Sequence, residues 1–382
     1  MTDASLNVLF VDDEPRVLEG IERMMFGVAA DWVIDTAGGG DEALAKLAAE
    51  DFAVVVSDLR MPGMDGATLL AKVAARHPSV VRVLHSGESD DDLMMRAVQV
   101  AHRFLAKPCG AEAMYEVVQR TQRLCAMLSD EALRAQLAQL GPLPSPPQSY
   151  LALVGALRDG EVTLDAVCAI VSRDPSLAAR VLHMANSAFF CRSASPVTQI
   201  RPAISRVGTR ILRSLALSSA IFQPTSRPDT AALIEHVQRH ALATAALAMR
   251  LAGPTPARDD AFTAALLHDV GLVAIAAMAP ERLADLGPAE HGRADRERAA
   301  LGATHAEIGA HLLDLWGLPL PIVEAVHTHH TPEAIPRAHA RIAALTHVAD
   351  ALVSGEEPSA EVVTAYGLAD EVERVRARDG SA

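Results

Sequence analysis

The first 125 residues alternate short, apolar, β-branched runs with longer segments in which apolar residues recur at helical spacing. This alternation predicts a parallel sheet whose strands are joined by crossover helices. We therefore predict an α/β domain with a five-stranded parallel sheet over residues 1–125. Its five expected strands are Asn7–Val11, Trp32–Thr36, Ala53–Ser57, Val80–Leu84 and Arg103–Ala106.

After residue 125 the strand pattern ends and the apolar spacing becomes helical. The stretch Thr121–Leu140 contains neither Gly nor Pro, so we expect one helix there, with residues 126–140 linking two domains. The run GPLPSPP at residues 141–147 marks the start of the second domain. We expect an all-helical domain over residues 141–353, followed by a C-terminal tail at 354–382.

Composition limits the partners that the chain can have. Half of the residues are apolar and 21% are charged, which is typical of globular domains. A net charge of -14 argues against broad nonspecific attraction to nucleic acid or to anionic membranes, although it leaves a local basic patch open. The four cysteines form no CxxC pair, and no apolar run approaches the roughly 18 residues of a membrane span. We expect a cytoplasmic protein without a signal peptide, whose partners are proteins or small ligands.

Polar side chains gather where the predicted strands end. Asp12 and Asp13 follow the first strand. Asp58 follows the third strand, Ser86 comes just after the fourth, and Lys107 follows the fifth. Because ligands of an open parallel sheet bind beyond the carboxyl ends of its strands, we expect these side chains to share one rim. Two carboxylates about 4 Å apart repel by about 4 kcal/mol at an effective dielectric of about 20. The rim therefore favours a divalent cation, and oxygen ligands suit Mg²⁺.

Four runs within residues 5–123 resemble the receiver domain of bacterial response regulators: VLFVDDEP, VVVSDLRMPGMDG, VLHSGES and FLAKPC. The resemblance implies a doubly wound, flavodoxin-like sheet of five strands. It also implies that a histidine kinase or phosphotransfer protein transfers a phosphoryl group to Asp58 with the help of Mg²⁺. The other roles that it implies are Mg²⁺ binding by Asp12, Asp13, Asp58 and the carbonyl of Arg60, contact with the phosphoryl oxygens by Lys107, and a conformational switch at Ser86 and Phe104.

Most of the 15 histidines lie beyond residue 230. His268 and Asp269 are adjacent in the apolar segment AFTAALLHDVG, where a charged side chain needs a specific partner. Imidazole and carboxylate together suit Fe, Mn or Zn, so this pair is either part of a metal site or a hydrogen-bonded pair in the core. We expect ordinary core or surface positions for His236, His291, His311, His339 and His347.

Five segments between about residues 141 and 350 resemble the HDOD domain, a branch of the HD metal-dependent phosphohydrolase superfamily: LPSPPQSY, IVSRDPSLAARVLHMANSAFF, AISRVGTRILRSLAL, FTAALLHDVG and HAEIGAHLLDLWGLPLPIVEAVHTHH. The metal residues of the superfamily would fall on His240, His268, Asp269, His305, His329, His330 and Asp350. Two positions depart from the hydrolytic HD-GYP relatives, because Leu272 replaces a common lysine and TPEAIPRAH replaces a DGxGYP run. We therefore expect His240, His268, Asp269 and Asp350 to lie close together but to bind a transition metal weakly or not at all.

The two resemblances together imply a two-component response regulator. Phosphorylation of Asp58 would change how a regulatory, non-hydrolytic HDOD domain binds a protein partner, and homodimer formation is left open. The alternative is a metal-dependent phosphodiesterase that acts on a cyclic dinucleotide, which bound metal together with turnover would distinguish. A DNA-binding function is opposed by the acidic charge and by the lack of a recognisable DNA-reading helix.

Overall fold

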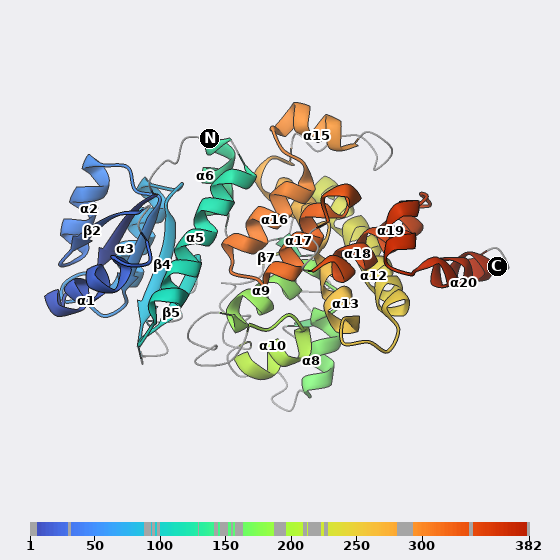
Figure 1. The fold of residues 1–382 in the computed structure, drawn as a ribbon, viewed down its shortest axis with the longest axis horizontal. Helices are drawn as coiled ribbons and strands as arrows, with labels where there is room; N and C mark the ends of the chain where they lie inside the picture. The colour runs from blue at the N-terminus through green and yellow to red at the C-terminus, as the bar shows by residue number, and fades with distance from the viewer. Residues whose placement is uncertain are drawn as a thin grey trace. The chain divides into compact units, whose positions relative to one another are not determined.

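The computed structural model divides the chain into two compact units, mainly Met1–Gly141 for the first and mainly residues 142–382 for the second (Figure 1). It describes residues 6–379 apart from 30–31, 88–92, 94–95, 98–99, 129, 141–143, 146–151, 154–155, 157–162, 187–195, 209–211, 213–222, 225–227, 281–292 and 336–338.

The first unit contains the predicted parallel sheet. Its strand order is β2-β1-β3-β4-β5, so β1 lies between β2 and β3. Val8 in β1 pairs with Ile34 and Val54 in its two neighbours and is fully buried. The predicted fold class is confirmed, and the strands differ from the expected ones only at their ends. They are β1 (Leu6–Val11), β2 (Trp32–Ala37), β3 (Val54–Asp58), β4 (Val81–Ser86) and β5 (Arg103–Ala106).

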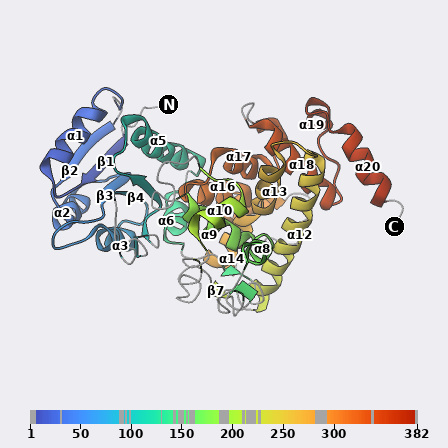
Figure 2. The same cartoon turned by 90° about the horizontal axis from the view of Figure 1, so that it is seen from below.

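Helices cover both faces of this sheet, with α1 and α5 on one face and α2 and α3 on the other (Figure 2). Met25 of α1 and Met114 of α5 are fully buried in one core cluster with Val8 and Val56 of the sheet. The carboxyl ends of the strands are left free for the rim residues. The helices of this unit are α1 (Pro15–Met25), α2 (Gly40–Ala49), α3 (Gly66–Arg76), α5 (Ala111–Met127) and α6 (Glu131–Gln139).

The stretch predicted as one helix, Thr121–Leu140, contains parts of two helices. α5 ends at Met127, and α6 starts after Asp130, whose side chain accepts a hydrogen bond from the backbone N–H of Leu133 at 3.1 Å. An Asp at this position satisfies a backbone donor that the first helical turn leaves unpaired. The absence of Gly and Pro did not reveal the break because an Asp cap needs neither.

The second unit is helical, as predicted, with one exception among the described residues. Pro144–Ser145 (β6) pairs in parallel with Gln223–Pro224 (β7). The helices α12, α13, α17 and α18 pack against one another. The helices are α8 (Leu164–Val171), α9 (Pro175–Ala185), α10 (Ile200–Val207), α12 (Pro228–Ala252), α13 (Arg258–Leu267), α14 (Val270–Met278), α15 (Arg293–Leu301), α16 (His305–Leu315), α17 (Leu320–Thr328), α18 (Ala340–Val353), α19 (Ala360–Ala365), α20 (Ala369–Asp379) and the 3₁₀ helix η2 (Pro332–Ala334).

The segment Arg258–Met278 is long and apolar enough to cross a membrane, with a mean hydropathy of 1.8. However, 78% of the 18-residue stretch that gives this hydropathy is buried inside the helical unit. The core helix of a globular domain meets the same criteria, so this segment is only weak evidence for a membrane.

Gly271 lies where α14 crosses α16. A Cβ atom at this position would lie 1.9 Å from the carbonyl oxygen of His305 and 2.9 Å from the backbone nitrogen of Gly309. We expect Gly271→Ala to push the two helices apart and to lower the free energy of unfolding of this unit by about 1–3 kcal/mol. Scanning calorimetry would measure this, with Gly20→Ala as control because a Cβ there meets no atom within 4 Å. Equal transition temperatures for the two variants would contradict the prediction.

Candidate functional site

The predicted acidic rim forms at the carboxyl ends of β1, β3 and β5. Lys107 Nζ donates to Asp12 Oδ2 at 2.7 Å and to Asp58 Oδ1 at 2.5 Å. The side chains of Asp12 and Asp58 are mostly buried, with 5% and 12% exposed. Burial alone would lower the pKa of Lys107, but the two carboxylates outweigh it and leave this pKa above its ordinary value. The ammonium thus bridges both carboxylates and offsets their repulsion.

Backbone N–H groups hold the other oxygen of each carboxylate. Glu14 N donates to Asp12 Oδ1 at 3.0 Å, and Arg60 N donates to Asp58 Oδ2 at 2.7 Å. Gly66 lies against Asp58, where a Cβ atom would approach the carbonyl oxygen of Asp58 to 2.1 Å. The loop after β3 therefore requires glycine at this point to keep Asp58 in place.

The remaining rim residues occupy neighbouring positions. Asp13 lies in the turn after β1 and is exposed. Ser86 ends β4, its Oγ lies 3.4 Å from the carbonyl of Gly87, and its own carbonyl accepts from Lys107 N at 2.8 Å. Phe104 lies in β5 and is partly buried. This backbone hydrogen bond makes Ser86 and Lys107 neighbours at the rim.

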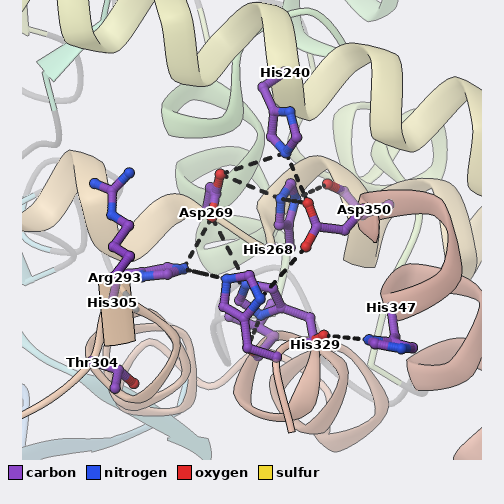
Figure 3. Close-up of polar contacts among 12 residues, drawn as sticks. His240, His268, Asp269, Arg293, Thr304, His305, His329, His347 and Asp350 are labelled. Carbon is purple, nitrogen blue, oxygen red and sulfur yellow. Dashed lines mark hydrogen bonds and ion pairs between the residues drawn. The ribbon is translucent and has the colours of Figure 1, made fainter. Parts of the chain in front are cut away.

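In the helical unit, all the residues expected as HD-type metal ligands lie together (Figure 3). They form two groups, and within each the nearest ligand atoms all lie within 4.8 Å of one another. The four-residue group is Asp269, His305, His329 and His330, and the three-residue group is His240, His268 and Asp350. The expectation that His240, His268, Asp269 and Asp350 are close in space is therefore confirmed, and the structure adds His305, His329 and His330 to this cluster.

Breaks between helices direct several of these side chains to the same place. His268 and Asp269 occupy the turn between α13 and α14, where the backbone of Asp269 leaves helical geometry with φ −98° and ψ 12°. His305 begins α16, and His329 and His330 follow the end of α17. Adjacent residues at such a break can face one centre, which they cannot do inside a continuous helix.

The carboxylate of Asp269 faces both groups. Its Oδ1 lies 3.2 Å from His305 Nε2 and 3.8 Å from His329 Nε2. Its Oδ2 lies 3.3 Å from His268 Nε2 and 3.9 Å from His240 Nε2. With one oxygen directed to each group, Asp269 has the geometry of a bridging ligand.

Three imidazoles direct their Nδ1 atoms away from the centre, toward acceptors. A histidine whose Nδ1–H donates to such an acceptor presents the lone pair of Nε2 on the other side, as metal-bound histidines do. The three contacts are His268 Nδ1 to Ala265 O at 2.6 Å, His329 Nδ1 to Val326 O at 2.7 Å and His305 Nδ1 to Glu297 Oε2 at 2.7 Å.

Nε2 atoms of the four-residue group contact one another. His305 Nε2 lies 3.3 Å from His329 Nε2 and 3.2 Å from His330 Nε2. Two lone pairs at this distance repel, so a proton or a metal ion has to lie between them. Burial would lower the pKa of His305, but Asp269 and Glu297 raise it to about 9, so a proton fills this role when no metal is bound. The nitrogen and oxygen donors also fit a transition-metal ion, which would compete with this proton for the lone pairs of the imidazole nitrogens.

Both aspartates of the cluster are ionised. Burial would raise the pKa of Asp269, yet His268 and His305 hold it well below its usual range. His240 and His268 do the same for Asp350, whose Oδ1 lies 2.9 Å from His240 Nε2. His268 Nε2 is buried and faces both carboxylates, at 3.3 Å from Asp269 Oδ2 and 3.4 Å from Asp350 Oδ1, which raise the pKa of His268 despite its burial. The centre thus combines two carboxylates with imidazole nitrogens, on which a proton or a metal ion can offset the negative charge.

Of the histidines expected to be ordinary, those in the described part of the chain lie outside both groups. His347 Nδ1 lies 2.7 Å from the carbonyl of His329, and its Nε2 accepts from Ser359 N at 3.2 Å. His339 Nδ1 lies 2.7 Å from Glu324 Oε2. His311 is buried, His236 is exposed, and His291 lies outside the described residues.

Comparison with known proteins identifies both units. The model of the response regulator receiver domain matches residues 8–119, and that of the HDOD domain matches residues 143–332. The C4-dicarboxylate transport transcriptional regulatory protein DctD of Rhizobium meliloti is 31% identical over 120 residues, which cover 31% of this chain but only 26% of DctD.

Two solved structures resemble the chain over most of their own length. The MmoQ response regulator from Methylococcus capsulatus is 24% identical with a TM-score of 0.48, and the match covers 61% of this chain and 96% of that one. A virulence factor from Campylobacter jejuni is 19% identical with a TM-score of 0.51, and the match covers 63% of this chain and 90% of that one. This second likeness supports the fold. With both family models matched in order along the sequence, this chain belongs to the response regulators and joins a receiver domain to an HDOD domain.

Proposed function

We propose that Asp58 accepts a phosphoryl group from a histidine kinase or a phosphotransfer protein, and that this changes how the HDOD domain binds a protein partner. The observation that supports the first step is the position of Lys107, held between Asp12 and Asp58 at the rim. An ammonium in this place can offset charge on a transferring phosphoryl group.

The transfer needs a nucleophile and charge neutralisation. A carboxylate oxygen of Asp58 attacks phosphorus while the bond from phosphorus to the donor atom breaks, which gives an acyl phosphate. Mg²⁺ would neutralise the phosphoryl oxygens, and Asp12, Asp13, Asp58 and the carbonyl of Arg60 would hold it, since all are oxygen donors. Lys107 is within reach of Asp58 and would then pair with the new phosphoryl oxygens.

The switch residues would transmit the change. A phosphoryl group adds nearly two negative charges, which the hydroxyl of Ser86 can contact, and its movement leaves space for the ring of Phe104. Moving a population from 1:99 to 99:1 takes about 5.5 kcal/mol. A few charge-assisted hydrogen bonds of about 1.5–3 kcal/mol each are sufficient.

Removal of Mg²⁺ should stop phosphoryl uptake. With acetyl phosphate as donor, we expect a chelator to lower the initial rate on the order of a hundredfold, because the charge on the transferring group is then poorly neutralised. Intact-protein mass spectrometry would measure uptake, and excess Mg²⁺ should restore it where sodium at equal ionic strength does not. Uptake at the same rate with and without chelator would contradict the proposal.

We also propose that the HDOD domain binds transition-metal ions, one at each group of donors. The expectation of weak binding rested on neighbouring motifs that differ from those of hydrolytic relatives, at Leu272 and at residues 331–339. The donor geometry is a separate observation, because contacting Nε2 atoms and two buried carboxylates that face His268 Nε2 favour a bound cation. Because those motifs differ, we assign the metal a structural or regulatory role.

Metal content tests this second proposal. The full-length chain would be freed of metal with a chelator, equilibrated with Zn²⁺ or Mn²⁺, desalted and subjected to elemental analysis. We expect one ion for each group of donors. Metal at background level after equilibration with either ion would contradict the proposal.

A further inference from the structure

Glu297 is a completely buried acid on α15 that belongs to neither group of donors. We propose that it is a positioning residue for His305, and that it makes the four-residue group the tighter of the two metal sites. This inference rests on the metal centre proposed above.

Both oxygens of Glu297 are held in place. Oε2 accepts from the backbone N–H of His305 at 2.8 Å and lies 2.7 Å from His305 Nδ1. Oε1 accepts from Arg293 Nε at 2.8 Å. The carboxylate therefore fixes both the main chain at the start of α16 and the orientation of the imidazole.

The connection between α15 and α16 supports this arrangement. Thr304 N donates to Glu307 Oε2 at 2.8 Å, and Glu307 N donates to Thr304 Oγ1 at 3.2 Å, which is a capping box at the start of α16. Arg298 of α15 pairs with Glu307 at 2.9 Å. The end of α15 is thus fixed against the helix that carries His305.

His305 differs from two other histidines of the cluster in the charge of its partner. The Nδ1 atoms of His268 and His329 face neutral backbone carbonyls, whereas that of His305 faces a carboxylate. A carboxylate behind a metal-binding imidazole increases its basicity as a ligand. His305 Nε2, which points toward Asp269 Oδ1 at 3.2 Å, is therefore the strongest donor of these three and lies in the four-residue group.

The test compares the affinities of the two ions. Zn²⁺ would be titrated into the full-length chain against a chromophoric chelator. Glu297→Gln keeps an oxygen that can accept Nδ1–H but loses the charge, so we expect one of the two ions to bind 10–100-fold more weakly and the other to be unchanged. The weakened ion should be the one lost in His330→Gln and kept in His240→Gln.

A matched control lies in the same unit. Glu324 Oε2 lies 2.7 Å from His339 Nδ1, outside both groups, so Glu324→Gln should leave both affinities unchanged. If Glu297→Gln does not fold, Arg293→Gln is the milder variant, because it removes only the donor that holds the carboxylate, and it should weaken the same ion several-fold.

The outcomes separate the two proposals. No Zn²⁺ in the wild type would overturn the metal centre itself. Zn²⁺ in the wild type with equal affinities in Glu297→Gln and Glu324→Gln would overturn the role of Glu297 alone. Equal weakening of both ions in Glu297→Gln, together with a lower melting temperature of the metal-free chain, would show a merely structural role and would also overturn it.

Discussion

Asp58→Asn should abolish phosphoryl uptake by the full-length chain. The amide has the shape of the carboxylate, but it is a poor nucleophile and lacks the charge that Lys107 contacts at 2.5 Å. With acetyl phosphate and Mg²⁺ we expect incorporation to fall to background, at least about a hundredfold below the wild type. Intact-protein mass spectrometry, followed by peptide mapping, would measure this.

The sequence offers a matched control for this variant. Asp35 Oδ1 accepts from Lys46 Nζ at 2.7 Å, so it forms an Asp–Lys pair that lies outside the rim. Asp35→Asn should retain full uptake. Incorporation in Asp58→Asn at the wild-type level, or an equal loss in both variants, would contradict the assignment of Asp58.

Asp269→Asn should remove both metal ions from the HDOD domain. One oxygen of Asp269 faces each group, so a single substitution reaches both sites. Loss of an outer partner already weakens metal binding 10–100-fold, so loss of a bridging ligand should cost each ion at least about a hundredfold in affinity. Elemental analysis after equilibration with Zn²⁺ would measure the loss.

Asp260 provides the control for this second variant. Its Oδ1 accepts from Thr198 Oγ1 at 2.5 Å in the same unit, away from both groups. Asp260→Asn should bind as much Zn²⁺ as the wild type. Retention of both ions by Asp269→Asn would show that this carboxylate does not bridge the two sites.

The fold and the acidic rim could be predicted from the sequence because local patterns determine them. β-branched runs such as Val54–Asp58 identify strands, and parallel topology then brings the residues at the strand ends together. The break before α6 could not be predicted in this way. It depends on one Asp cap at position 130, which helical spacing does not distinguish from an exposed residue.

The metal donors were predictable in part. The adjacent His268 and Asp269 stand out in an apolar segment, whereas their grouping with donors from other helices is a tertiary property. Glu297 was missed because its segment, RADRERAAL, is so highly charged that each acid there is expected to be solvated. Only the folded chain shows that this one side chain is buried against His305.

Hydrogen exchange of the full-length chain with and without beryllofluoride and Mg²⁺ tests most directly whether the state of Asp58 controls the HDOD domain. We predict that the phosphoryl analogue changes protection in residues 121–140 and also in residues 174–211 of the HDOD domain, and that Asp58→Asn removes both changes. Exchange that changes at the rim but is identical in both states throughout the HDOD domain would contradict this regulation.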